Sequence, residues 1–139
     1  MSTEQTATTA DIEFDIDSWD EAAYDEPADG PKLTRVTITK TYRGILEGKG
    51  VADVLTAQGA AGAGFVASER VSGTLDGRAG TFVIQHGGLA EGDQQSTYGS
   101  VVPGSGTGAL AGLTGEATEA AQGVLTLTYR LPGLTPQHG

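Results

Sequence analysis

The chain of 139 residues contains no cysteine. This absence excludes disulfide frameworks, thiol catalysis, iron–sulfur clusters and cysteine-ligated zinc. Long hydrophobic runs are absent too, since no segment approaches the roughly 20 apolar residues that a membrane-spanning helix requires. The first residues, Met-Ser-Thr-Glu-Gln, have neither the basic start nor the apolar stretch of a signal peptide. We therefore expect a soluble, cytoplasmic protein with no membrane partner.

Basic residues are missing from positions 1–30, which contain ten of the 18 acidic residues. The other eight acidic residues equal the eight Lys and Arg residues in number, so the net charge of −10 arises from the N-terminal part of the chain. Nucleic acids and anionic lipids are bound by clustered Lys and Arg side chains. We therefore expect no nucleic-acid partner and no binding to anionic membranes.

Histidine is scarce as well, because only His86 and His138 are present. Two histidines without cysteine do not make a convincing zinc site, and we predict no metal. Ser105 lies in a loop without the strand–turn–helix context that exposes a nucleophilic serine. A Ser-His-Asp site is therefore not predicted.

Glycine is abundant, with 22 residues, and is densest in Pro-Gly-Ser-Gly-Thr-Gly at positions 103–108. The spacing resembles a dinucleotide-binding fingerprint, but no strand-to-helix unit surrounds it. The Gly-Lys-Ser/Thr of a phosphate-binding loop is also missing. We expect no nucleotide and no other cofactor, and we interpret this segment as a corner where a strand bends sharply.

The remaining glycines separate short segments rich in Val, Ile, Leu and Thr, a pattern typical of strands. Residues 11–17 alternate acidic and apolar side chains with a period of two, which is the clearest strand signal. The sequence predicts an all-β fold, a single antiparallel eight-stranded barrel, with a β-sandwich as the alternative. The expected strands are 11–17, 33–42, 45–57, 64–75, 81–86, 96–102, 109–117 and 124–131. They form a barrel domain over 11–131, between a disordered N-terminal tail (1–10) and a C-terminal tail (132–139).

Two titratable residues share the inward-facing parity of neighbouring strands. Glu69 has the same parity as Phe65 and other apolar residues of its strand, and His86 has the same parity as Phe82. A four-residue loop at 76–79 would place Glu69 directly opposite His86, and a two-residue loop would make them diagonal neighbours within roughly 8 Å. Because burying either charge alone costs several kcal/mol, the pair is either a sealed structural pair or part of a polar cavity.

Aromatic residues provide the candidate walls of such a cavity. We consider Trp19, Tyr98, Phe65 and Phe82 as ligand-binding residues, although aromatic residues on strands are usually core residues. Trp19 falls on the acidic parity of the first strand. It must therefore either follow a bulge or cover the mouth of the barrel.

Several motifs together resemble a bacterial family of proteins, domain-of-unknown-function family 3224. The motifs span roughly residues 11–131 and lie at 18–21, 44–48, 72–82, 85–87 and 102–113. The resemblance implies a barrel of the allene oxide cyclase type, a fold also used by dirigent-like proteins and polyketide cyclases. Relatives with this fold enclose an apolar cavity that orients a reactive molecule, and they are often dimers or trimers. The resemblance implies no catalytic residues and no reaction.

Our leading functional hypothesis is a barrel that binds a small hydrophobic molecule and acts as a cofactor-independent isomerase or cyclase. Glu69 would be the general base or electrostatic stabiliser and His86 its proton partner, as the catalytic residues. The alternative is a non-catalytic binding or assembly module whose interior is filled with side chains. A cavity of about 300 Å³ or more that touches both residues would favour the first hypothesis.

Overall fold

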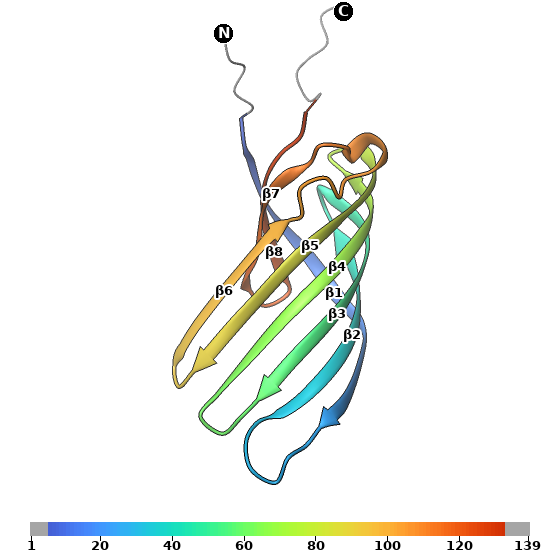
Figure 1. Cartoon of the computed structure of the whole chain (residues 1–139). Helices are drawn as coiled ribbons and strands as arrows, with labels where there is room; N and C mark the ends of the chain where they lie inside the picture. Colours follow the sequence, from blue (N-terminus) through green and yellow to red (C-terminus); the bar gives the residue numbers. More distant parts are fainter. Residues whose placement is uncertain (1–5, 133–139) are drawn as a thin grey trace, which may run out of the picture.

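The computed structural model describes residues 6–132. Its eight antiparallel strands form one closed ring in sequence order, with β8 returning to β1 (Figure 1). The all-β antiparallel barrel is therefore confirmed, and the sandwich alternative is not formed. The elements are β1 (Thr8–Asp25), β2 (Lys32–Arg43), β3 (Leu46–Gln58), β4 (Gly62–Leu75), β5 (Arg78–Glu91), β6 (Gln94–Val101), the 3-10 turn η1 (Gly108–Leu110), β7 (Thr114–Ala121) and β8 (Val124–Arg130).

The first strand begins earlier than the sequence predicts. Residues 8–10, expected in a disordered tail, belong to β1 because they pair with residues 127–129 of β8. Residues 1–5 and 133–139 of the two expected tails lie outside the described residues. No helix within residues 6–132 is both long and apolar enough to span a membrane.

The strand expected at 109–117 is wrong in its first half. Residues 108–110 form the 3-10 turn η1, and β7 starts only at Thr114. The physical reason is the side-chain packing, since Leu110 and Leu113 are buried in the core and fill one end of the barrel. The glycine-rich segment before them runs along β5, where the amide of Thr107 donates to the carbonyl of Thr81. The segment therefore leads into a plug at the end of the barrel.

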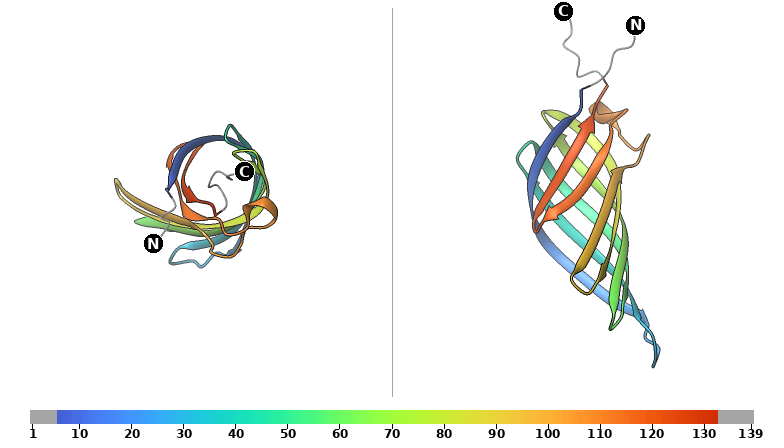
Figure 2. Two further views of the ribbon diagram at one scale, coloured as in Figure 1. Left: turned by 90° about the horizontal axis from the view of Figure 1, so that it is seen from above. Right: turned by 90° about the vertical axis from the view of Figure 1, so that its left-hand side faces the viewer.

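The ring of strands closes along only part of its length. The β1–β8 ladder covers residues 8–13 of β1, and the β6–β7 ladder consists of Ser100 and Val101 with their partners. Beyond these pairs, β1 and β6 are the two edges of a curved six-stranded sheet, and the strands between them are visible through the opening in the right-hand view of Figure 2. We call the part with all eight strands the closed half and the part built from β1 to β6 alone the open half.

The two halves contain separate groups of buried apolar residues. The closed half is filled by sixteen buried side chains, among them the rings of Tyr42, Phe82 and Tyr129. The open half has a smaller group, and Phe65 packs against it. The members of this smaller group are Val36, Ile38, Ala52, Val54 and Ala67.

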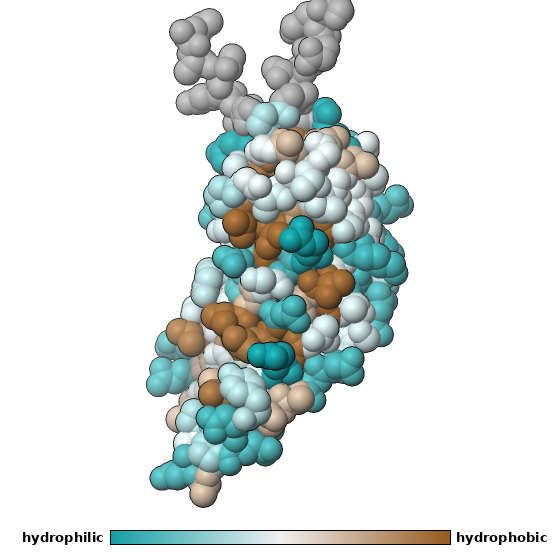
Figure 3. All heavy atoms as spheres, turned by 45° about the vertical axis from the view of Figure 1, so that its right-hand side comes forward, coloured by the Kyte–Doolittle hydropathy of each residue, from teal (hydrophilic) through white to brown (hydrophobic). Residues whose placement is uncertain are grey.

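The convex outer face of the sheet also carries hydrophobic side chains. Figure 3 shows hydrophobic patches, separated by hydrophilic side chains, over the middle and lower part of this face. Leu55 and Val66 are direct cross-strand neighbours there, and both are exposed. Scattered exposed apolar residues of this kind are common on protein surfaces.

Candidate functional site

A cavity of about 520 Å³ lies on the concave side of the open half. Its walls are mainly apolar and include residues of all eight strands, with Val36, Ile38, Val54 and Phe65 among them. Glu69 and His86 both belong to its lining. A volume of this size, with mainly apolar walls and a few polar groups, is typical of small-molecule sites.

The β4–β5 hairpin decides how these two residues meet. Leu75 pairs with Arg78, so the connection is the two-residue turn Asp76-Gly77, in which both residues have positive φ (51° and 81°). Such turns match the right-handed twist of antiparallel strands. The four-residue loop is therefore wrong and the two-residue alternative is confirmed.

With this turn, Glu69 pairs with Ile84, while His86 pairs with Ala67. The two titratable side chains are diagonal neighbours on the inner face of the sheet. The expected inward direction of both residues is confirmed, since Glu69 is only 1% exposed and His86 lines the cavity.

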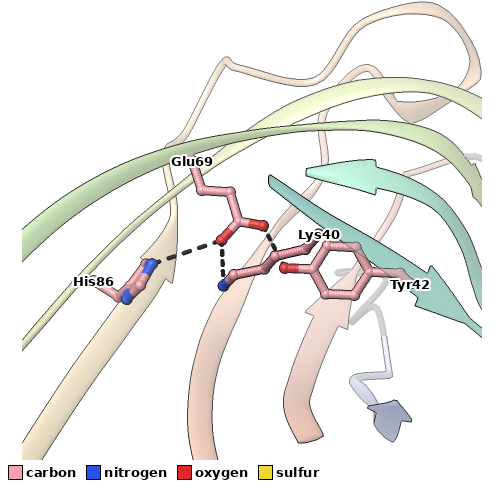
Figure 4. Close-up of polar contacts among 4 residues, drawn as sticks. All are labelled: Lys40, Tyr42, Glu69 and His86. Carbon is pink, nitrogen blue, oxygen red and sulfur yellow. Dashed lines mark hydrogen bonds and ion pairs between the residues drawn. The ribbon is translucent and has the colours of Figure 1, made fainter. Parts of the chain in front are cut away.

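Glu69 is held by two residues of β2 (Figure 4). Lys40 Nζ donates to Glu69 Oε1 at 3.1 Å, and the Tyr42 hydroxyl donates to Glu69 Oε2. His86 Nε2 lies 3.7 Å from Glu69 Oε1, an ion-pair distance that is too long for a hydrogen bond. The Glu69 carboxylate is therefore fixed on one side and approached by an imidazole on the other.

Electrostatics keep Glu69 ionised despite its burial. Burial alone would raise the pKa of Glu69, but His86, the Lys40 ammonium and the Tyr42 hydroxyl outweigh it and hold this pKa below its ordinary value of 4.5. Burial raises the pKa of Tyr42, and the negative charge of Glu69 raises it further, so Tyr42 remains a neutral donor. Glu69 therefore carries its charge at neutral pH.

A glycine creates the space for this carboxylate. Gly50 of β3 pairs with Lys40 on one side and with Val71 on the other. A Cβ at position 50 would overlap Glu69 Oε2 and lie 2.9 Å from the Tyr42 ring. The absence of a side chain at this position therefore allows Glu69 to reach across β3 to β2.

His86 lies where the polar group meets the cavity. Its side chain is 22% exposed, and its Nε2 is buried with no hydrogen-bond partner among the described residues. Phe65 packs edge-on against the imidazole at a centroid distance of 5.8 Å. The ring is thus placed by an aromatic neighbour and directed at Glu69.

Trp19 reaches the cavity because β1 contains a bulge. The β1–β2 register shifts between Ile16 and Ser18, so that Trp19 pairs with Ile38, whose side chain faces the concave side. This bulge confirms the first of the two expectations for Trp19. Its indole Nε1 donates to Glu21 Oε1 at 3.1 Å, and both side chains line the cavity.

The other three aromatic candidates lie in three different environments. Phe65 lines the cavity, as the hypothesis requires. Phe82 is fully buried in the closed half and does not contact the cavity. Tyr98 pairs with Gly87, one residue away from the inward-facing His86, so its ring covers the outer side of Gly87 at the rim.

Sequence reasoning missed Lys40, Tyr42 and Glu119. Lys40 and Tyr42 share the parity of the buried Val36 and Ile38 on β2, so period-two alternation already placed them on the inner face. Glu119 of β7 is an exposed residue that lines the cavity, and partial desolvation there raises its pKa. No comparable signal was available for Glu119, because it lies beyond the end of the strand expected at 109–117.

The described residues contain no group of three or more His, Cys, Asp or Glu side chains that could hold a metal ion. The titratable groups of the cavity lining are instead one lysine, one histidine, one tyrosine at the rim and three glutamates. These groups can bind, orient and transfer a proton.

The fold and the site define a class of protein: an antiparallel eight-stranded barrel with one packed half and one half that forms an apolar cavity above a buried ion pair. The chain belongs to the family described as "Protein of unknown function (DUF3224)", whose model matches residues 10–131. A crystal structure at 1.84 Å resolution, of a family member of unknown function from Shewanella oneidensis MR-1, has a TM-score of 0.78 and 33% sequence identity. That match covers 90% of this chain and 98% of the other. None of the curated proteins compared with the chain matches it.

Proposed function

We propose that this protein binds a small, largely apolar molecule in the open half and acts on it as a cofactor-independent isomerase or cyclase. The observation that carries the proposal is the cavity of about 520 Å³, because its mainly apolar lining includes both Glu69 and His86. The alternative of a non-catalytic module with a filled interior fits the closed half alone. The open half has a hollow where that alternative requires side chains.

His86 is the group that would transfer protons, and Glu69 the group that would position it. Glu69 is already bound by Lys40 and Tyr42 and its pKa is lowered, so it is a poor base. Its negative charge, facing Nε2 at 3.7 Å, favours a proton on that nitrogen and leaves the lone pair on Nδ1. Such carboxylate–imidazole contacts often tighten when a ligand binds.

The proposed step conserves atoms and electrons within the substrate. Nδ1 of His86 removes a proton from a carbon next to a carbonyl group, and the electron pair of the broken C–H bond moves to the carbonyl oxygen. In a substrate with a C=C double bond next to that carbon, the carbonyl then re-forms, the double bond shifts into conjugation with it, and the far carbon of the original double bond takes the proton back. This completes an isomerisation without any oxidant or reductant. The Lys40 ammonium lines the cavity and would stabilise the negative charge that develops on oxygen.

The resemblance to barrels of the allene oxide cyclase type supports this proposal. Relatives with that fold hold a reactive molecule in a folded conformation, so that cyclisation depends mainly on orientation and exclusion of water. A site with few acid–base groups, as here, fits chemistry of this kind.

Binding can be tested with the neutral dye Nile red and two matched variants of β3. Val54 lines the cavity, whereas Val51 of the same strand is exposed on the outer face. Val54→Trp should fill the cavity and abolish saturable Nile red fluorescence, while Val51→Trp should leave it unchanged. Equal binding by both variants would place the dye elsewhere and reject the proposed cavity.

The chemistry can be tested by deuterium exchange at the α-carbons of 2-decanone in D₂O, followed by NMR. General base catalysis contributes about 10²-fold or more, so the protein should accelerate exchange by at least that factor over buffer. His86→Asn should return the rate to that of buffer while Nile red still binds. Exchange that is no faster than in buffer, with binding intact, would reduce the proposal to binding alone.

A further inference from the structure

A second polar group lies at the outer end of the same cavity and has no part in the proton transfer proposed above. It consists of Trp19 and Glu21 of β1, Thr34 of β2 and Gln58 of β3, and we call it the mouth cluster. Glu21 Oε1 accepts a hydrogen bond from Trp19 Nε1 at 3.1 Å, and Glu21 Oε2 accepts from Thr34 Oγ1 at 2.9 Å and Gln58 Nε2 at 2.8 Å.

The Glu21 carboxylate of the mouth cluster is held by more hydrogen bonds than an ordinary surface carboxylate. Donors from three strands fix Glu21, and one of them, Thr34, is 1% exposed. The bulge between Ile16 and Ser18 turns this part of β1 so that both Trp19 and Glu21 line the cavity. Holding a surface glutamate in one position costs side-chain entropy, which three hydrogen bonds offset.

Within the described part of the chain, no ion pair neutralises the charge of Glu21. Among residues 6–132, no basic side chain lies within 4 Å of Glu21. Its three donors are neutral groups and lower its pKa, with Trp19 as the largest cause, and the positive charge of Lys32 adds a smaller lowering. The carboxylate is therefore charged, fixed in position and able to accept a further hydrogen bond.

The cavity as a whole favours a positive ligand. Lys40 is the only Lys or Arg residue in its lining, and Lys40 is already paired with Glu69. Glu21 and Glu119 add two further acidic groups, and the net charge of the chain is −10. An anionic group would be repelled by Glu21 and Glu119. Within the cavity lining it would find no Lys or Arg other than the paired Lys40, since Lys32, which acts on Glu21, is not part of that lining.

The polar groups lie far apart, with apolar wall between them. Lys40 and Thr34 are six residues apart on β2, which corresponds to roughly 20 Å along a strand. The inward-facing residues between them are Val36 and Ile38, and Val54 faces the cavity beside them. A ligand that contacts both ends must have a long apolar body.

We propose that the ligand of this cavity is an elongated apolar molecule with a protonated amine at one end, and that Glu21 and Trp19 bind this ammonium group. This inference rests on the proposed function, because it assigns a ligand class to the same cavity. The Glu21 carboxylate accepts a charge-assisted hydrogen bond from the amine. The indole of Trp19 lies against this carboxylate and offers a face for a cation–π contact.

The test uses the fluorescence of Trp19, which is the only tryptophan in the chain. Dodecylammonium, dodecanol and dodecanoate are titrated at pH 7 below their micelle concentrations. An exposed ion pair together with a cation–π contact should make dodecylammonium bind at least about fivefold more tightly than dodecanol, with dodecanoate weakest. Glu21→Gln should remove this preference without weakening the binding of dodecanol.

The matched control is Asp20→Asn, which removes the same charge one residue away, outside the cavity lining. This variant should keep the preference for the ammonium. Equal affinity for all three probes, or tightest binding of dodecanoate, overturns the ammonium site and leaves the proposed cavity intact. A preference that is lost in Asp20→Asn as much as in Glu21→Gln also overturns it, because the effect is then one of net charge. Absence of binding by all three probes, with Nile red excluded as well, overturns both proposals.

Discussion

The closed and open halves are built on the same strands, yet they use their inner faces differently. In the closed half, β7 and β8 complete the ring and sixteen buried side chains fill it, with Leu110 and Leu113 as a plug. In the open half these two strands do not cover the sheet, and its inner face borders a cavity of about 520 Å³, to which β7 and β8 contribute only a few lining residues such as Glu119 and Leu125. The length of the β7–β8 hairpin therefore separates a packed core from a cavity wall within one sheet.

The buried ion pair lies at the boundary between the halves. Tyr42 belongs to the core of the closed half, whereas Lys40 and Glu69 line the cavity of the open half. A buried ion pair rarely makes a protein more stable than an apolar pair of similar size would. Removing only one of the two charged partners, however, strongly lowers the free energy of unfolding. A polar group at this place is better explained by function than by stability.

The largest expected effect comes from removing one member of this pair. Lys40→Met leaves Glu69 buried without a counter-charge, and the free energy of unfolding should fall by about 3–5 kcal/mol. Urea denaturation at pH 7 measures this loss. The double variant Lys40→Met/Glu69→Gln is the control and should recover most of the stability, because it leaves no unpaired charge.

The same pair predicts how stability depends on pH. The pKa of Glu69 is lower in the folded protein than its ordinary value of 4.5. Below pH 4.5 the unfolded state therefore binds more protons at this group, and stability falls as the pH drops toward the folded pKa. The loss between pH 6 and pH 3 should be smaller in Lys40→Met/Glu69→Gln than in the wild type, and equal slopes would show that Glu69 is not involved.

The next largest effect is the difference in stability loss between the two halves when an isoleucine is replaced by alanine. Ile12 is fully buried in the closed half, and Ile38 forms a wall of the cavity. Ile12→Ala should cost about 3–4 kcal/mol, since a packed core cannot fill the new void. Ile38→Ala enlarges an existing hollow and should cost about half as much. Equal losses of the free energy of unfolding would contradict the distinction between the halves.

Gly50→Ala tests the space beside the ion pair. The new methyl group would overlap Glu69 Oε2, so we expect a loss of about 1–3 kcal/mol from local overpacking. Gly64→Ala is the control on the neighbouring strand, because its Cβ would lie 3.0 Å from the flexible end of Leu89 and at an ordinary contact distance of 3.5 Å from the carbonyl oxygen of Gly88. Thermal unfolding of both variants should show the larger drop in Tm for Gly50→Ala.

The smallest effect on stability is expected at the mouth. Trp19 is an exposed residue, so Trp19→Phe should change the free energy of unfolding by less than about 0.5 kcal/mol. The same substitution removes the hydrogen bond to Glu21, and calorimetric titration with dodecylammonium should show weaker binding. A large loss of stability with unchanged binding would make Trp19 a structural residue.

The sequence by itself determined most of the strands and, away from the bulge in β1, the faces of their side chains. Period-two alternation places Glu69 and His86 inward, and it places Lys40 and Tyr42 on the same inner face. Turn chemistry at Asp76-Gly77 allowed two registers, and the pattern of side chains did not choose between them. These features are local, because a strand has the same period whatever its partner is.

Only the tertiary structure decided how far the ring closes and which polar groups meet. The β6–β7 and β1–β8 ladders are short because strands distant in sequence diverge, and no local pattern records this divergence. Glu69 meets Lys40 across Gly50, and Glu21 meets Gln58 across β2, over separations of 29 and 37 residues. Both contacts depend on the curvature of the sheet and on the bulge in β1, which are properties of the assembled strands rather than of any one segment.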